Sequence, residues 1–207
     1  MAEHTATVTV NAPVHDVYEL YSHFNDYPKF MTFVKEVTYL DDSHSHWVVD
    51  VVGKHEWDAV NDGWIPDRQI GWHSVDGLSN SGQVRFDPLP DDRTQLTVHV
   101  SYEPPAGALG QLGEALGAGG QFERRLRHDL EHFAAMVEAA PSGALDPTSS
   151  SYLFHAGSAA ASGTTTQAQN ETMGMYADDA APVPSTTSVA DDELKEPGVP
   201  RIPGTGP

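Results

Sequence analysis

Apolar side chains recur at every second residue through much of the stretch 46–102, which is the period of a β-strand with one buried face. Connections rich in Asp, Gly, Pro and Ser interrupt this alternation at hairpin-like spacing. The sequence therefore predicts an antiparallel sheet of seven strands. Their expected ranges are 5–10, 34–40, 46–52, 55–61, 69–75, 82–87 and 94–102.

Three other segments have helical character. After Pro13, apolar residues at positions 14, 17, 18 and 21 predict a helix, and a short second helix is expected over 25–31. The last helix is predicted over 121–139, where apolar residues recur every three or four positions. These residues are Phe122, Leu126, Leu130, Phe133 and Val137. Such a stripe must lie against an apolar surface.

Only one of the two faces of the predicted sheet is apolar enough to pack against the last helix. The outward face carries mostly polar residues, among them His73 and Arg85. The face expected to meet the last helix carries Trp47, Val49, Val51, Trp57, Ala59, Ile70, Trp72, Ser74, Val84, Phe86, Leu96, Val98, Val100 and Tyr102. The pattern predicts an α+β fold in which a curved sheet wraps around a long C-terminal helix.

Charge and composition exclude several classes of partner. The 207 residues include 30 acidic and 11 basic side chains, a formal net charge of −19. Nucleic-acid affinity depends on Lys and Arg replacing counterions, so no nucleic acid is expected to bind. Cysteine is absent, and neither a signal peptide nor a run of about 18 apolar residues is present. We expect a cytoplasmic protein without stable membrane insertion.

Composition changes after Ala140, where Ala, Ser, Thr, Gly and Pro replace the periodic apolar residues. We expect a folded domain over 1–140 and a disordered acidic tail over 141–207, because the tail has little apolar surface to bury. Tyr152–Phe154 and Met173–Tyr176 are apolar islands, read either as docking motifs for a protein partner or as chance occurrences. Deleting the tail is predicted to leave thermal stability nearly unchanged.

The predicted elements follow one another as strand, two small helices, six strands and a long helix, and several short motifs lie along them. They are Val10-Asn11-Ala12-Pro13, Asn25-Asp26-Tyr27-Pro28-Lys29-Phe30, Trp57-Asp58-Ala59, Ile70-Gly71-Trp72-His73-Ser74, Ser81-Gly82-Gln83-Val84-Arg85-Phe86, Tyr102-Glu103-Pro104-Pro105 and Asp129-Leu130-Glu131-His132-Phe133. In this order and with these motifs, residues 4–139 resemble the START-like (SRPBCC) superfamily with its helix-grip fold, and within it the bacterial polyketide cyclase/dehydrase and coenzyme Q-binding branch.

The resemblance implies a pocket between the concave sheet and the long helix, used for lipids, quinones, sterols or polyketides and sometimes for catalysis. Apolar lining is typical of sites for hydrophobic ligands. The same residues would also suit a solid core. Three functions stay open: binding of a small hydrophobic or amphipathic molecule, a polyketide cyclase/dehydrase-like reaction, and a protein-interaction module.

The predicted ligand-binding residues combine the inward face of the sheet, the last helix and the glycine-rich segment before it. They are Trp47, Val49, Trp57, Trp72, Ser74, Val84, Phe86, Val98, Val100, Tyr102, Leu109, Leu112, Phe122, Leu126 and Phe133. Alternation leaves Ser74 and Tyr102 as the polar side chains that clearly point inward, which makes them the candidate catalytic residues of an enzyme. No cofactor and no metal site are predicted, because the histidine pairs of the chain lie at a hairpin tip and on an outward helix face.

Overall fold

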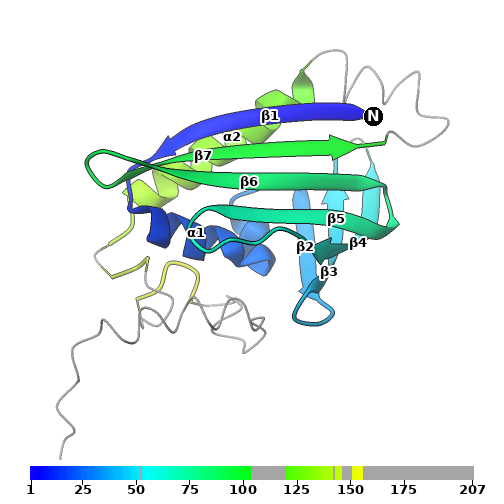
Figure 1. Ribbon diagram of the computed structural model, residues 1–207, viewed down its shortest axis with the longest axis horizontal. Coiled ribbons are helices and arrows are strands. Elements are labelled where there is room, and N and C mark those ends of the chain that lie inside the picture. Colours follow the sequence, from blue (N-terminus) through cyan, green and yellow to red (C-terminus); the bar gives the residue numbers. More distant parts are fainter. Residues whose placement is uncertain (52, 104–119, 142, 146–150, 156–207) are drawn as a thin grey trace, which may run out of the picture.

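The computed structural model describes residues 1–51, 53–103, 120–141, 143–145 and 151–155. Within these ranges the elements follow one another as β1 (Ala2–Val10), α1 (Val14–Ser22), the 3₁₀ helix η1 (Phe24–Lys29), β2 (Val34–Tyr39), β3 (His44–Asp50), β4 (Lys54–Asn61), β5 (Gln69–Gly77), β6 (Asn80–Leu89), β7 (Arg93–Tyr102) and α2 (Gln121–Glu138) (Figure 1).

The strands form one antiparallel sheet in the order β1-β7-β6-β5-β4-β3-β2. In Figure 1 the sheet curls, so that β2, β3 and β4 stand at a steep angle to the long strands, and α2 runs behind β1 and β7. This is the helix-grip arrangement, with α1 and η1 between the first two strands. The predicted α+β class, the number of strands and the position of the long helix are confirmed.

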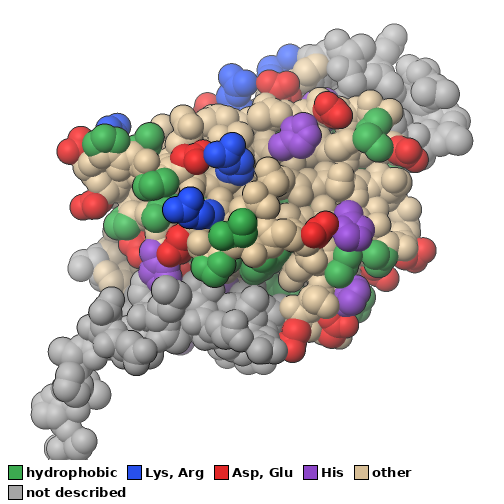
Figure 2. Space-filling model, in the orientation of Figure 1, with side chains coloured by type: hydrophobic (Ala, Val, Ile, Leu, Met, Phe, Trp, Pro, Cys, Tyr) green, Lys and Arg blue, Asp and Glu red, His purple; other side chains and the backbone are tan. Residues whose placement is uncertain are grey.

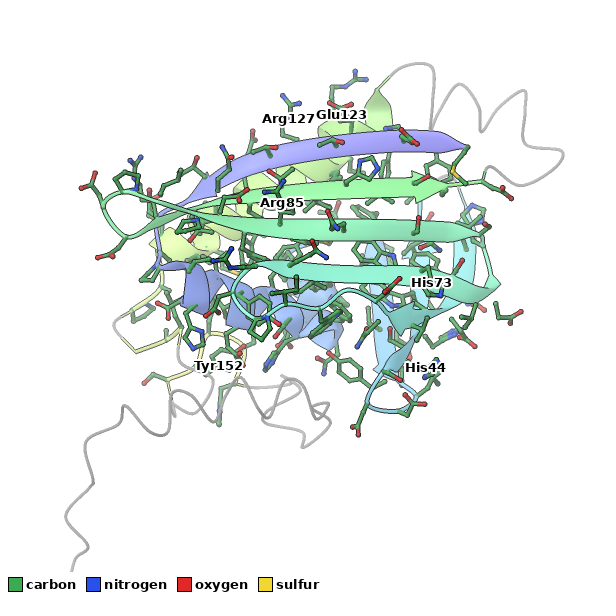
Figure 3. The ribbon with its side chains drawn as sticks, in the orientation of Figure 1. His44, His73, Arg85, Glu123, Arg127 and Tyr152 are labelled. Atoms are coloured by element: carbon green, nitrogen blue, oxygen red, sulfur yellow. The ribbon has the colours of Figure 1, made fainter. Side chains whose placement is uncertain are left out.

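Alternation separates the two faces of the sheet as predicted. The outer face carries charged and polar side chains of both signs (Figure 2). His73 of β5 and Arg85 of β6 lie on it and are 50% and 60% exposed (Figure 3). Their outward orientation confirms the prediction. The inner face and the apolar stripe of α2 together form the core, since Leu126, Leu130 and Phe133 are buried completely or nearly so.

Two predicted ligand-binding residues belong to the tightly packed part of this core. Phe86 packs edge-on against Tyr18 and Tyr21, at ring-centroid distances of 5.3 and 6.0 Å. Phe133 packs against Tyr21 and Phe30 at 5.3 and 4.9 Å. Both phenylalanines therefore have protein rings as their neighbours, and neither is among the residues that line the cavities described below.

A buried carboxylate ties α2 to the loop after η1. Asp129 accepts hydrogen bonds from the backbone N–H of Thr32 at 2.8 Å and from the Thr32 hydroxyl at 3.1 Å. Burial raises the pKa of Asp129 above its usual range, although the Thr32 hydrogen bonds lower it. The bonds join segments 97 positions apart in the sequence and hold the start of β2 against the helix.

Some residues beyond 140 pack on the body of the protein. Tyr152 and Phe154 are only 3% and 4% exposed. The Phe154 ring stacks near Phe30 at 6.3 Å, and Lys29 donates to the Phe154 carbonyl at 3.1 Å while its ammonium lies 4.8 Å from the ring centre. We call residues 151–155 the C-terminal clamp. The two aromatic rings bury enough apolar surface to order it. The rest of the predicted tail lies outside the described residues.

The clamp covers a buried polar pair on α1. His23 Nε2 and Glu19 Oε1 are 3.0 Å apart, and both side chains are completely buried. The Tyr152 ring packs edge-on to His23 at 6.3 Å. Removing an ionisable pair from water is costly, and a close hydrogen bond between the two groups offsets part of this cost. The clamp therefore provides the apolar cover over the outer side of α1.

Candidate ligand-binding site

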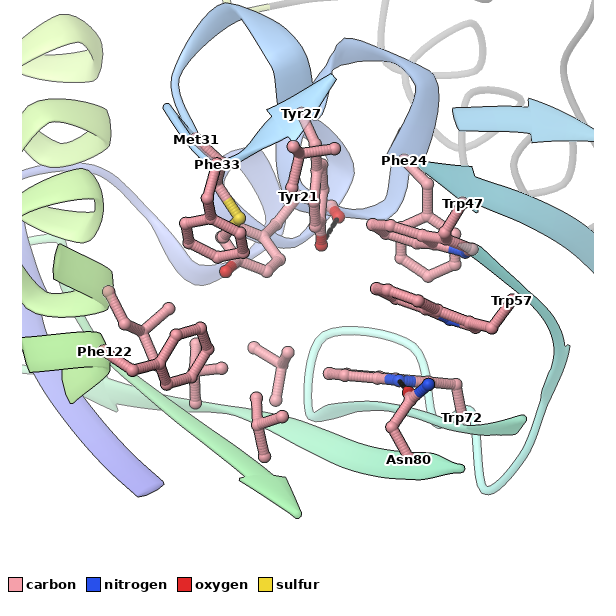
Figure 4. A pocket seen from close by; sticks show the side chains of 15 residues that line it. Tyr21, Phe24, Tyr27, Met31, Phe33, Trp47, Trp57, Trp72, Asn80 and Phe122 are labelled. Carbon is pink, nitrogen blue, oxygen red and sulfur yellow. Dashed lines mark hydrogen bonds between the residues drawn. The ribbon is translucent and has the colours of Figure 1, made fainter. Parts of the chain in front are cut away.

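A cavity lies between the inner face of the sheet, the first turns of α2 and the α1–η1 corner (Figure 4). We call it the main cavity. Its free space, including the open mouth, is about 570 Å³. The lining residues are Tyr21, Phe24, Tyr27, Met31, Phe33, Val34, Trp47, Trp57, Trp72, Asn80, Val84, Val98, Val100, Phe122 and Leu126. The core is thus not solid on this side of the sheet.

Three tryptophans form one wall of the main cavity. Trp47 and Trp57 are cross-strand partners on β3 and β4, and their rings stack at 5.8 Å with only 5° between the planes. Trp72 of β5 continues the series, with its ring nearly parallel to that of Trp57 in Figure 4. Parallel indole faces on neighbouring strands offer a flat aromatic surface, which favours planar, ring-containing ligands.

The indole N–H groups of this wall differ in whether they have a hydrogen-bond acceptor. Trp47 donates to the Ser45 hydroxyl at 2.8 Å, and Trp72 donates to Asn80 Oδ1 at 3.0 Å. Trp57 Nε1 is buried and has no hydrogen-bond partner among the described residues. An unpaired buried donor costs about 1–3 kcal/mol. A ligand oxygen would satisfy it.

A glycine fixes the position of the third tryptophan. Gly82 of β6 is the cross-strand partner of Trp72. A Cβ atom built on Gly82 would overlap Cζ2 and Cη2 of the Trp72 ring, far inside a normal van der Waals separation. The ring therefore lies flat over the backbone of β6, and only glycine allows this approach.

The α1–η1 corner forms the roof of the main cavity, which the sequence analysis did not predict. Tyr21, Phe24 and Tyr27 all line the space. The Tyr27 hydroxyl donates to the Tyr21 carbonyl at 2.9 Å. The Tyr21 hydroxyl is buried without a partner among the described residues, and burial raises its pKa above the ordinary value. Tyr21 therefore keeps its proton and can donate to a ligand, but it is a poor base.

A second cavity adjoins the first at the end of the sheet where β1 begins and β7 ends. Its free space is about 490 Å³. Phe33, Val100 and Phe122 line both cavities, and the rings of Phe33 and Phe122 lie 5.4 Å apart. The two cavities are therefore neighbouring chambers divided by side chains. Val49, Val51, His55, Leu78 and Tyr102 complete the lining of the second one.

Two polar side chains reach this second cavity. His55 Nε2 is buried and has no hydrogen-bond partner among the described residues. Burial raises the pKa of Tyr102, so its hydroxyl stays protonated. His4 stacks on Tyr102 with 5.8 Å between ring centres and 15° between planes. The statement that only Ser74 and Tyr102 clearly point inward is thus wrong: His55 shares the alternation of Trp57 and Ala59 on β4, and this signal was readable in the sequence.

The predicted site residues fall into five groups. The main cavity is lined by Trp47, Trp57, Trp72, Val84, Val98, Val100, Phe122 and Leu126, and the second by Val49 and Tyr102 together with the shared Val100 and Phe122. Leu109 and Leu112 lie outside the described residues, and Phe86 and Phe133 belong to the packed core. Ser74 lines neither cavity, and its Oγ accepts the Asn80 backbone N–H at 2.9 Å. Its hydroxyl is used to hold the turn between β5 and β6.

The described residues lack the features of two other kinds of site. They contain no group of three or more His, Cys, Asp or Glu side chains placed to hold a metal ion. No helix in the described ranges combines the length and the apolar character that a membrane span needs.

Known proteins resemble this chain over the same region as the fold. A protein of Streptomyces lincolnensis, an uncharacterized 17.2 kDa protein encoded between melC2 and rnhH, is 31% identical over 140 residues, which are 67% of this chain and 91% of that protein. The crystal structure of DR_A0006 from Deinococcus radiodurans is 28% identical with a TM-score of 0.54, covering 67% of this chain and 98% of that one.

An aromatase/cyclase shares the fold at lower identity. The Zhui aromatase/cyclase from Streptomyces sp. R1128 is 24% identical with a TM-score of 0.54, covering 66% of this chain and 93% of that one. The family described as polyketide cyclase/dehydrase and lipid transport matches residues 10–131, which include the roof, the tryptophan wall and most of α2. The chain therefore belongs to the polyketide cyclase/dehydrase and lipid transport family.

Proposed function

We propose that the protein binds or carries a small hydrophobic or amphipathic molecule with a planar ring system in the main cavity. The observation that carries this proposal is the wall of parallel indoles at Trp47, Trp57 and Trp72 facing an apolar space. A pocket with apolar walls and few polar groups is typical of sites for such molecules. Lipid-, quinone- and polyketide-like compounds all include members of this class.

The two unpaired donors refine the proposal. Trp57 Nε1 and the Tyr21 hydroxyl both belong to residues that line the main cavity and lack partners in the described part of the chain. Donors of this kind favour a ligand with carbonyl or ether oxygens over a pure hydrocarbon. A quinone or polyketide ring meets this requirement better than an acyl chain does.

A cyclase/dehydrase-like reaction is the second candidate, and the composition of the main cavity counts against it. Among the described residues that line the main cavity, none carries a carboxylate or an imidazole. General acid–base chemistry needs such a group within reach of the substrate. His55 in the adjoining cavity is the nearest candidate on the inner face. Binding is therefore the better-supported function, and catalysis would depend on His55.

The test of binding uses 1-aminoanthracene, a planar apolar dye whose emission rises in dry surroundings. We expect the protein to enhance the dye's emission at a single site. Val98→Phe should abolish the enhancement, because Val98 is 2% exposed and lines the main cavity, so the ring would occupy ligand volume. Overpacking costs about 1–3 kcal/mol, so the melting temperature of the variant is measured alongside.

Val75→Phe is the matched control, since Val75 is 56% exposed. This variant should bind the dye like the original protein. Equal loss of binding in both variants, or binding that survives Val98→Phe in a folded protein, would contradict a ligand site in the main cavity.

A further inference from the structure

The second cavity has apolar walls but contains two side chains able to hydrogen-bond. Val49, Val51 and Leu78 supply apolar walls, and His55 and Tyr102 supply an imidazole and a phenol. His55 comes from the first residues of β4, and Tyr102 is the last residue of β7. The sheet curls (Figure 1), and His55 at the start of β4 and Tyr102 at the end of β7 line the same cavity.

The chemistry of these groups indicates what they can recognise. Tyr102 is 7% exposed, and its raised pKa keeps the hydroxyl protonated, so it can donate. His55 Nε2 is buried and without a partner in the described part of the chain. A neutral imidazole with its proton on Nε2, or an imidazolium, also donates from that atom. Two donors in an apolar chamber fit one oxygen acceptor.

The position of the second cavity beside the main cavity indicates how a ligand with one polar end would be oriented. The two spaces share Phe33, Val100 and Phe122, so only side chains separate them. Phe33 and Phe122 are single rings packed at 5.4 Å, and a change of side-chain rotamer is the movement by which they would open a passage between the spaces. A molecule whose ring system lies against the tryptophan wall can then extend a polar end to His55 and Tyr102.

We propose that the second cavity is a head-group subsite, in which His55 and Tyr102 donate to a carbonyl or carboxylate oxygen of the molecule bound in the main cavity. The inference rests on the proposed function, since it assigns the orientation of that ligand. It adds specificity: a ligand with an oxygen at one end is preferred over a hydrocarbon of equal shape. It also assigns roles to two residues on the inner face, one of which the sequence analysis did not consider.

The experiment uses a matched pair of probes, 2-acetylnaphthalene and 2-isopropylnaphthalene, which differ by a carbonyl oxygen in place of a methyl group. Each displaces 1-aminoanthracene from the full-length protein, and the ratio of their affinities is the readout. Each hydrogen bond to the carbonyl corresponds to about a fivefold difference in affinity. We expect the ketone to bind at least about fivefold tighter than the hydrocarbon.

His55→Phe and Tyr102→Phe should each reduce this ratio about fivefold while the hydrocarbon's own affinity changes little, because the apolar walls remain. His55→Gln retains an N–H donor and should keep most of the preference. His73→Phe, the same change on the outer face of β5, should leave the ratio unchanged. Melting temperatures of all variants establish that each is folded.

The outcomes separate the two proposals. If neither probe displaces the dye, ligand binding in the main cavity is wrong and the subsite fails with it. If both probes bind with equal affinity, or if the ratio is the same in His55→Phe, Tyr102→Phe and the original protein, the head-group subsite is wrong while ligand binding stands.

Discussion

Gly82 is the residue at which one methyl group would disturb the candidate site most directly. The Trp72 ring lies over its backbone, and a Cβ at this position would overlap the six-membered part of the indole. Trp72 is also held by the hydrogen bond from its Nε1 to Asn80. The ring cannot move away from a new methyl group without losing that bond or entering the main cavity.

Gly82→Ala is therefore expected to displace Trp72 and weaken 1-aminoanthracene binding about tenfold, with a change in the near-ultraviolet circular dichroism of the tryptophans. Ser81→Ala is the control, because Ser81 is exposed on the same strand and pairs with His73 instead of Trp72. An unchanged affinity in Gly82→Ala would show that the third indole does not contribute to the site.

Asp129 is the residue whose titration links the fold to pH. Its pKa is raised by burial, so the folded protein keeps this proton to a higher pH than the unfolded chain does. The stabilising contribution is complete below the ordinary value of 3.8 and is lost as the pH rises through the raised pKa. Asp129→Asn, which is neutral at every pH, removes this dependence while keeping an acceptor for Thr32.

We expect the free energy of unfolding of the original protein to decrease relative to Asp129→Asn as the pH rises from about 3.8. Urea unfolding at closely spaced pH values between 3.5 and 7 measures the difference. A difference that stays constant, or that changes in the opposite direction, would show that the buried carboxylate keeps an ordinary pKa.

At the scale of elements, the α1–η1 corner serves two surfaces at once. Tyr21, Phe24 and Tyr27 face the main cavity. On the other side, His23 lies beneath Tyr152, and Phe30, just past η1, packs against Phe154. The C-terminal clamp therefore supports the roof of the cavity from behind. The α1–η1 corner is therefore the segment that connects the C-terminal clamp with the main cavity.

Phe154→Ala tests the clamp. Removing a ring that is 4% exposed is expected to lower the free energy of unfolding by about 3 kcal/mol. Leu153→Ala, at the partly buried position between the two aromatic residues, should cost less than about 1 kcal/mol. Chemical denaturation of both variants gives the comparison. Two equally small effects would mean that the body of the protein is stable without the clamp, as the tail prediction from the sequence assumed.

At the scale of the whole molecule, the periodic elements were predictable and the non-periodic contacts were not. The alternation of Trp47, Trp57 and Trp72 predicted their common face, and the stripe of α2 predicted its packing. The roof was missed because Phe24 and Tyr27 lie in an irregular corner, where no period assigns a side-chain direction. Tyr152 lies in a short apolar island within a stretch of small and polar residues, and its burial depends on a surface far away in the sequence.

The pairing of β1 with β7 has a consequence for folding during synthesis on the ribosome. Ala2 lies opposite Tyr102, so β1 finds its partner strand only after about one hundred further residues are made. At about 5–20 residues per second this wait lasts roughly 5–20 seconds. During that time Ala2–Val10 is an unpaired strand edge, the kind of segment from which aggregation begins. Threonines at every second position of its second half keep one side of the waiting strand polar.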